Sequence, residues 1–411
     1  MRYPIVLVFL FPFALQAQER TLDFYLGRAL KNSPAFRDLN NQALLNRQDS
    51  LLLRAALRPQ VGASAAASIA PNYRGFGYDP AQSNGGFFNA LLGVNQPIGL
   101  NKNLEAQFLA FTVQNETLKN TARLTEQDLR RSVGAQFISA YGVGRQLAFN
   151  RETVDLLRRE EAVFKRLTEQ NIYRQTDYLT FLSSLRQQET TVRQLEIQYQ
   201  NEFGTLNSLC GLTDTSTVQL ALPALDLPLL PAVEQTVFYQ KFTLDSLQIR
   251  ADDQLIDIPY RPSVSLLGDA GYNSSFLSQG WKNLGFSVGA SVSVPLRDGG
   301  QRRLRHAKTS ILENTREGYR DFFLQQYWQE IAQARQQLAA LDLLDQSVQQ
   351  QLQTVRALIE ANGRLLRTGE AQVLDYLMAV GNSLNAQNQL TINEITRLQI
   401  LNQLNFRNAR N

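Results

Sequence analysis

The sequence has little of the side-chain chemistry on which most enzymes and metalloproteins depend. Its 411 residues include one cysteine, Cys210, and one histidine, His306. A single cysteine excludes an intrachain disulfide, and these two residues cannot supply the ligand set of a typical metal site. A phosphate-binding glycine loop, a nucleophile elbow and a zinc-binding helix are also missing from the sequence. We therefore expect no enzymatic activity, no cofactor and no metal, and a fold held together by packing.

Clustered charge and long apolar runs are scarce as well. The 41 Lys and Arg and the 37 Asp and Glu residues are spread along the chain, so there is no basic stripe to bind nucleic acid. The only continuously apolar run, Ile5 to Leu15, follows Arg2 and is too short to span a bilayer as a helix. With Ala17 as a small residue for cleavage, it predicts a signal peptide over residues 1–17 and an exported protein. A short buried helix is the alternative.

A repeat is present along the chain. Three short motifs recur in the same order at nearly the same spacing, which indicates a doubled unit. The pairs are Arg58-Pro59 with Arg261-Pro262, Gln96-Pro97-Ile98 with Val294-Pro295-Leu296, and Asp177-Tyr178-Leu179 with Asp375-Tyr376-Leu377. They divide the chain into a first repeat over 18–221, a Pro-rich connector over 222–231 and a second repeat over 232–411.

Each repeat predicts a helix, a β-hairpin and a long helical hairpin. In the first repeat we expect a helix from Leu22 to Leu57, a hairpin over 58–97 with strands Val61 to Ile69 and Ala90 to Gln96, and helices over 101–210. The second repeat predicts a helix from about Val233 to Ile258, a hairpin over 262–296 with strands Val264 to Tyr272 and Leu284 to Val294, and helices over 299–408. No proline interrupts the first helix of either long hairpin.

The long helix of the second repeat has an apolar seam and a polar remainder. Apolar residues step by three and four, as in packed helices: Leu341, Leu344, Val348, Leu352, Val355 and Ile359. The rest of this helix is rich in glutamine. Two interpretations of this wide polar surface are open. It faces solvent all round on a coiled-coil rod, or it faces partly solvent and partly the lumen of a tube.

The predicted strands have the pattern of lipid-facing β-structure. Apolar residues alternate with glycine and serine over about the nine to eleven residues that cross a bilayer. Aromatic residues flank the strands, as in the girdles of membrane barrels: Tyr73, Phe76, Phe87, Phe88, Tyr272, Phe276 and Trp281. A soluble two-sheet module with an aromatic core is the alternative, and the signal peptide favours the membrane. Because four strands cannot close a barrel in lipid, we expect several copies to share one.

The segment "VSVPLRDGGQRR", residues 292–303, predicts a turn from strand to helix. Pro295, like Pro97 in the first repeat, cannot donate to a β-ladder. Asp298 can cap the first helical turn, with Gln301 in the capping-box position. Gly299 and Gly300 allow the backbone to bend.

These motifs, in this order, resemble those of the TolC family of outer membrane efflux proteins. The resemblance rests on "VSVPLRDGGQRR", on "RTGEAQVLDYL" over 367–377, and on "TLDFYLGRALKNSPAF" over 21–36, and it covers essentially the whole mature chain. It implies a mainly α, TolC-like fold: a long α-helical barrel in the periplasm continued by a transmembrane β-barrel of twelve strands, four from each chain of a homotrimer in outer membrane lipid.

The same resemblance implies a function. The chain would be the passive outer membrane channel of a tripartite efflux system, with a periplasmic adaptor protein and an inner-membrane transporter as partners. The exit duct of a type I protein secretion system is an alternative, and so is an exported periplasmic coiled-coil scaffold. The transported substrate is not readable from the sequence.

The resemblance also assigns roles to residues near the ends of the long helices. Arg367, Thr368 and Gly369 would lie at the adaptor-facing tip, with Asn171 as the counterpart of Gly369 in the first repeat. Asp375, and less strongly Asp177, would form an acidic ring that gates the tunnel. The alternative is that both aspartates only cap or solvate the first turns of returning helices. Outside these motifs, the sequence predicts a small buried role for Cys210 at a helix end and a polar surface position for His306.

Overall fold

The computed structural model describes residues 20–71, 73, 76–77, 86–99, 101–228, 232–275 and 280–408. The predicted signal peptide and Phe276 lie outside these residues. The chain forms two compact units, and each takes segments from both sequence repeats. One unit contains the described parts of Met1–Phe36, Arg123–Val237 and Leu324–Asn411, and the other those of Arg37–Ala122 and Phe238–Phe323. The expected class, mainly helical with four strands, is confirmed.

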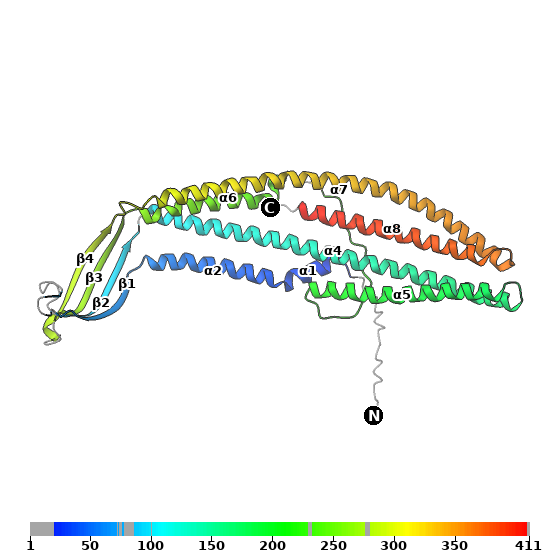
Figure 1. Ribbon diagram of the computed structural model, residues 1–411, viewed down its shortest axis with the longest axis horizontal. Helices are drawn as coiled ribbons and strands as arrows, with labels where there is room; N and C mark the ends of the chain where they lie inside the picture. The colour runs from blue at the N-terminus through cyan, green and yellow to red at the C-terminus, as the bar shows by residue number, and fades with distance from the viewer. Residues whose placement is uncertain are drawn as a thin grey trace, which may run out of the picture. The chain divides into compact units, whose positions relative to one another are not determined.

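The second of these units contains the sheet. Its strands are β1 (Gln60–Ile69), β2 (Gly86–Ile98), β3 (Ser263–Ser274) and β4 (Leu284–Ser293), paired antiparallel in the order β1-β2-β3-β4. The strands connect to α2 (Pro34–Ala56), α6 (Val237–Ile256), and the first parts of α4 (Asn101–Glu169) and α7 (Gln301–Thr368). In Figure 1 the four strands lie side by side in sequence order.

The strand β2 is longer than the pattern predicted. It extends from Gly86 to Ile98, and Pro97 is paired opposite Ser265. The alternation of side chains ends at Gln96, but the backbone remains extended. Proline is tolerated here because it stands one residue before the end of the strand, where its missing N–H removes at most one ladder bond.

The predicted helix from Leu22 to Leu57 is wrong as a single element. The structure has α1 (Leu22–Asn32) and α2 (Pro34–Ala56), separated by Ser33 in an extended conformation with φ −63° and ψ 123°. Proline disfavours the helical conformation in the residue before it, and its fixed φ suits the first position of a new helix. Pro34 therefore ends one helix and begins the next.

The other unit consists of α1, the later parts of α4 and α7, α5 (Gln175–Leu209) and α8 (Val373–Arg407). Hydrogen bonds join α4 to α5, from Gln136 to Glu202 at 2.7 Å, and α7 to α8, from Asn393 to Asp345 at 2.7 Å. Figure 1 shows these two long antiparallel pairs. One core gathers Tyr25, Phe137, Phe203 and their neighbours at the α1 end of the unit.

The predicted seam on α7 is confirmed at its centre. Val348, Leu352 and Val355 are buried, and Val348 and Leu352 pack in one cluster with Ala386 of α8, whereas Leu344 is 42% exposed. The glutamines at 333, 336, 337, 346, 349, 350 and 353 are all exposed. The seam holds α8, and the polar face of α7 is left on the surface of the unit.

Cys210 lies at the C-terminal cap of α5, as predicted, and is fully buried. Burial raises the pKa of its thiol to about 11. Gly211 follows with φ +64°, and the N–H of Leu212 donates to the carbonyl of Asn207 at 2.8 Å, which closes the helix end. The thiol is therefore a packed, protonated group at neutral pH.

Candidate functional site

The sheet exposes apolar side chains that a soluble domain would bury. Every residue of β1 and β4 is exposed, and on β4 the alternate residues Phe286, Val288 and Val292 are 84%, 83% and 65% exposed. Between them lie serine and glycine. An exposed apolar face of this size is typical of a surface that contacts lipid or another protein.

Aromatic residues gather at the end of the sheet away from the helices. Ile69 is paired with Gly86, and Tyr272 with Leu284, so Phe87, Phe88 and Tyr272 share this end. Trp281 precedes β4 and is 74% exposed, with the Lys282 Nζ 5.2 Å from its ring centre. Tyr73 and Phe76 follow β1 and are 71% and 84% exposed. The described residues of the predicted girdle therefore lie at the end of the sheet away from the helices, or close to a strand at that end.

The strand-to-helix turn after β4 is built on one carboxylate. Asp298 accepts hydrogen bonds from the backbone N–H of Gly300 at 2.9 Å and of Arg302 at 2.7 Å, and these N–H groups, Arg302 first, lower the pKa of its carboxyl. Gly299 and Gly300 have φ +64° and +86°, in the left-handed region that favours glycine. Gln301 forms no side-chain hydrogen bond among the described residues, and its N–H donates to the backbone carbonyl of Asp298 at 3.3 Å and not to the carboxylate, so the predicted capping box does not form. The Asp298 carboxylate therefore binds the backbone N–H groups at the start of α7 without help from the Gln301 side chain.

The ends of the long helical hairpins form two turns of the same type. Asn171 has φ +58° and Gly369 has φ +82°. After each, an N–H reaches the carbonyl five residues back: Ile172 to Leu167 at 3.0 Å, and Glu370 to Leu365 at 3.0 Å. Both are Schellman-type helix ends. Asn171 thus adopts the left-handed conformation in the first repeat that Gly369 adopts in the second.

The two turns contact each other directly. The Tyr173 hydroxyl lies 2.8 Å from the carbonyl oxygen of Leu366 and 3.1 Å from that of Ala371. A Cβ on Gly369 would lie 2.6 Å from the Ile172 Cγ2. Beneath the turns, Phe164, Phe181 and Tyr376 belong to one buried cluster. The residues predicted at the tip therefore belong to one packed structure, although Thr368 and Arg367 keep exposed surfaces.

Arg367 also has an internal partner. Its guanidinium donates to the Glu160 carboxylate at 2.6 Å, and this raises the pKa of Arg367. Glu160 is only 5% exposed. The pair joins α7 to α4 near both turns, which gives Arg367 a structural contact besides any contact with a partner protein.

The two candidate gate aspartates have different surroundings. The Asp177 carboxylate accepts a hydrogen bond from the N–H of Arg174 at 3.3 Å, which is a helix-capping contact. Asp375 lies at the equivalent position of α8, but its exposed carboxylate has no hydrogen-bond partner within the described part of the chain. Its backbone carbonyl accepts from Asn362 at 3.3 Å. The two aspartates therefore occupy equivalent positions in the repeats, but only the Asp177 side chain caps its helix.

This arrangement of sheet, turns and helical hairpins occurs in solved bacterial membrane channels. A membrane protein from Pseudomonas aeruginosa is 18% identical, with a TM-score of 0.77 over 95% of this chain and 90% of that chain. CusC, solved in a study of transmembrane channel formation, is 14% identical, with a TM-score of 0.78 over 95% and 93%. The CmeC outer membrane channel of Campylobacter jejuni is 14% identical, with a TM-score of 0.75 over 95% and 86%.

The fold is TolC-like. The resemblance seen in the sequence motifs is confirmed at the level of fold, since the similarity extends over nearly the whole of both chains. No protein-family model and no curated protein sequence matches the chain. Among the described residues, no helix of this TolC-like chain is both long and apolar enough to span a membrane.

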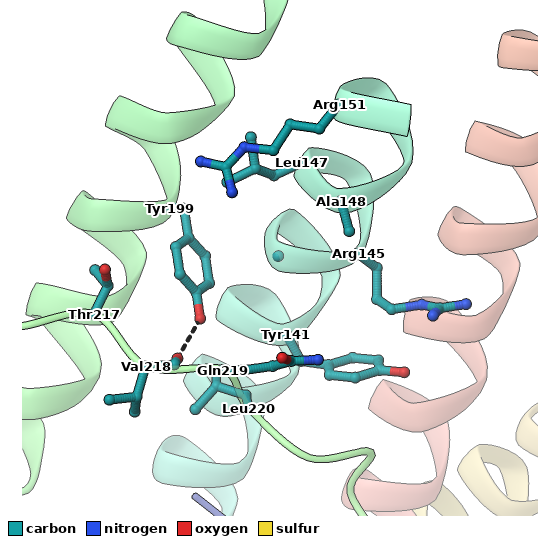
Figure 2. Close-up of a pocket in the computed structure, with 11 residues that line it drawn as sticks. Tyr141, Arg145, Leu147, Ala148, Arg151, Tyr199, Thr217, Val218, Gln219 and Leu220 are labelled. Atoms are coloured by element: carbon teal, nitrogen blue, oxygen red, sulfur yellow. Dashed lines mark hydrogen bonds between the residues drawn. The ribbon is translucent and has the colours of Figure 1, made fainter. Parts of the chain in front are cut away.

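One cavity of about 330 Å³ lies in the helical unit, between α4, α5 and the segment after α5. Figure 2 shows Tyr141, Tyr199 and Arg151 around it, with the Tyr199 hydroxyl donating to the carbonyl of Val218 at 2.6 Å. Burial raises the pKa of both tyrosines to about 12. Arg151 is held by Glu196 at 2.6 Å. None of the residues predicted from the sequence to be functional lines this cavity.

His306 is more than the polar surface residue that the sequence predicted. Its Nδ1 lies 2.7 Å from the Asp253 carboxylate and its Nε2 3.0 Å from that of Asp257, and Arg302 also binds Asp257 at 2.8 Å. The two aspartates, Asp253 first, raise the pKa of His306. Asp253 and Asp257 are four residues apart near the end of α6, a helical spacing that places them on one face. The pairing with His306 is a tertiary contact and has no sequence signal.

Proposed function

We propose that this chain is the outer membrane channel of a tripartite efflux system and conducts substrates passively. The observation that carries the proposal is the sheet: it is antiparallel and apolar at exposed positions of β4, and within the described residues one edge of β1 and one edge of β4 have no strand partner. In lipid, each unpaired backbone group costs several kcal/mol. Joining β4 of one copy to β1 of the next removes both edges.

The proposed assembly is a homotrimer with twelve strands around one pore. Small residues on β1 and β4, among them Ala65, Ala66, Ser287 and Gly289, suit a strongly curved wall. The long helical pairs would continue the pore into the periplasm, with their glutamine-rich faces toward water. The TolC-like fold supports this reading, and the paired tip turns give a periplasmic adaptor and an inner-membrane transporter a compact surface to meet.

The proposal is tested on the full chain expressed in a bacterium with an outer membrane. We expect the protein in the outer membrane fraction, to need detergent for extraction, and to run as a heat-sensitive trimer. In planar bilayers the trimer should conduct ions without ATP. A monomer recovered in the soluble periplasmic fraction would contradict the proposal and favour an exported scaffold.

The identity of the inner-membrane partner distinguishes an efflux channel from a protein-secretion duct. Cross-linking in cells followed by purification should recover an adaptor and a transporter that exports small molecules. Deletion of the gene should then raise the intracellular level of at least one small toxic compound. Recovery of a protein-secreting ATPase, with unchanged sensitivity to small compounds, would assign the chain to type I secretion instead.

A further inference from the structure

The helix-side end of the sheet has an excess of positive charge that the channel fold alone does not require. The register places the ends of all four strands together there: Gln60 pairs with Asn95, Ile98 with Val264, and Ser263 with Ser293. Just beyond these ends lie four arginines, which we call the cationic rim: Arg58, Arg261, Arg297 and Arg303.

No carboxylate neutralises the cationic rim within the described part of the chain. Arg58, Arg297 and Arg303 are exposed and have no hydrogen-bond or ion-pair partner there. Arg261 donates to the neutral side chain of Asn103 at 2.8 Å. The nearby acids are mostly engaged, because Asp257 binds Arg302 and His306, and Asp298 binds backbone N–H groups. Glu105, about one turn into α4, is an exposed acid without a partner in the described part of the chain.

The apolar surface ends where the cationic rim begins. Val292, Val294 and Leu296 continue the alternation of β4 and are 65%, 49% and 93% exposed, and Arg297 follows directly. At the opposite end of the sheet, Trp281 and Lys282 stand before β4. A sharp change from apolar to cationic side chains is the pattern of a protein surface at the boundary between hydrocarbon and charged headgroups.

We propose that the cationic rim binds the phosphate groups of anionic phospholipids in the membrane leaflet next to the helical part. This rests on the proposed function, because it requires the sheet to span the bilayer. Guanidinium groups donate two parallel hydrogen bonds to a phosphate, and an excess of cations at a membrane surface attracts anionic lipid. The bound headgroups fix the depth of the sheet in the membrane.

The test measures which lipids stay bound to the full-length protein. Wild-type protein is reconstituted into vesicles with equal amounts of phosphatidylglycerol and phosphatidylcholine, extracted in mild detergent, and its retained lipids are counted by mass spectrometry. We expect phosphatidylglycerol to be enriched, and Arg58→Gln/Arg297→Gln/Arg303→Gln to reduce the enrichment by up to roughly a hundredfold, since each of the three arginines near an anionic surface contributes about fivefold.

A matched control removes the same charge elsewhere. Arg193, Arg335 and Arg356 are exposed, lie on the long helices and have no partner among the described residues. Arg193→Gln/Arg335→Gln/Arg356→Gln should retain the wild-type enrichment. An equal loss in this control would show that net charge, not the cationic rim, selects the lipid, and would overturn the proposal.

Four further outcomes test the proposal even if the rim variant fails to fold. Enrichment on wild-type protein that falls steadily with added salt supports the proposal. Retention of the two lipids in the input ratio would overturn the lipid-binding proposal. If insertion and conductance are normal in the same experiment, the channel proposal survives. Loss of the enrichment in millimolar inorganic phosphate overturns the lipid-binding proposal in favour of a phosphate ion site, and failure to insert into any vesicle overturns both proposals.

Discussion

At the scale of single residues, the two candidate gate aspartates can be told apart by experiment. Asp375→Asn should leave stability unchanged and weaken the block of conductance by divalent cations, because three carboxylates near one axis attract such ions. Asp177→Asn should leave the block unchanged and lower the free energy of unfolding by about 0.5–2 kcal/mol, through loss of its capping contact. Single-channel recordings with and without Mg²⁺ measure the first effect, and denaturant unfolding measures the second. Equal divalent block in wild type and Asp375→Asn would remove Asp375 from the gate.

Gly369 is the residue at which the tip is most sensitive to substitution. Gly369→Val should impair efflux without preventing membrane insertion, because a β-branched residue is strained at φ +82° and its Cβ would lie 2.6 Å from Ile172. Gly381→Val in α8 is the control, since nothing lies within 4 Å of the Cβ it would add and its φ is not positive. Minimum inhibitory concentrations and outer membrane levels are measured together. Normal efflux by Gly369→Val would exclude the tip from the mechanism.

His306 predicts a pH dependence of stability. Its folded-state pKa is raised above the ordinary 6.5 by Asp253 and Asp257, so its contribution is complete below about pH 6.5 and is lost as the pH rises through the raised pKa. His306→Gln removes this contribution. The difference in melting temperature between wild type and His306→Gln should be largest near pH 6 and shrink toward pH 9. A difference that stays constant over this range would show that His306 does not act through its charge.

At the scale of secondary-structure elements, α4 and α8 are held at a distance set by glycine. A Cβ on Gly142 would lie 2.2 Å from the Ile395 Cδ1, so the two helices cannot approach this closely with a larger residue. Asn402 stands equally close to Gly134, and its side chain donates to the carbonyl of Arg131 at 2.9 Å. The helices therefore meet at two glycines two turns apart.

Because of this close approach, we expect alanine substitutions at two glycines to change the free energy of unfolding in opposite directions. Gly142→Ala should lower the free energy of unfolding by about 1–3 kcal/mol through overpacking. Gly204→Ala in α5 has open space around its Cβ and should raise it by about 0.5–1 kcal/mol, since alanine is the better helix former. Denaturant unfolding of both variants in one detergent makes the comparison. A rise in the free energy of unfolding for both variants would mean that helix propensity, not packing, dominates at Gly142.

At the scale of the whole molecule, a shared barrel requires β1 of one copy to lie beside β4 of another. Cys210 gives little background in cysteine cross-linking, because it is buried and its thiol pKa is raised to about 11. Ser64→Cys combined in turn with Ser287→Cys or Ser291→Cys should yield, on oxidation, a ladder that ends at the trimer.

The control for this ladder lies in the central strands. Ala90 and Tyr272 are paired across β2 and β3, so Ala90→Cys/Tyr272→Cys should form a disulfide within one chain and no ladder. Non-reducing gels after membrane extraction separate the two patterns. If the control disulfide forms and every β1–β4 pair remains monomeric, the shared barrel is wrong.

The sequence alone determined the features that depend on local periodicity. The period-two pattern from Leu284 to Val294, the seam around Val348 and Leu352, and the bend at Gly299 and Gly300 follow from residues close together in the chain. The break at Pro34 belongs with them, since the rule for residues before proline predicts it, although the uninterrupted amphipathic pattern favoured one helix.

Only the tertiary structure decided which distant side chains meet. Arg367 with Glu160, His306 with Asp253, and Gly142 with Ile395 are more than 50 residues apart along the chain. Such contacts depend on the rotation and the offset of packed helices, and a repeat of 3.6 residues fixes neither. The sequence could place a charge on a helix, but the packing of the helices determined whether that charge found a partner or was left free, as at Asp375 and the cationic rim.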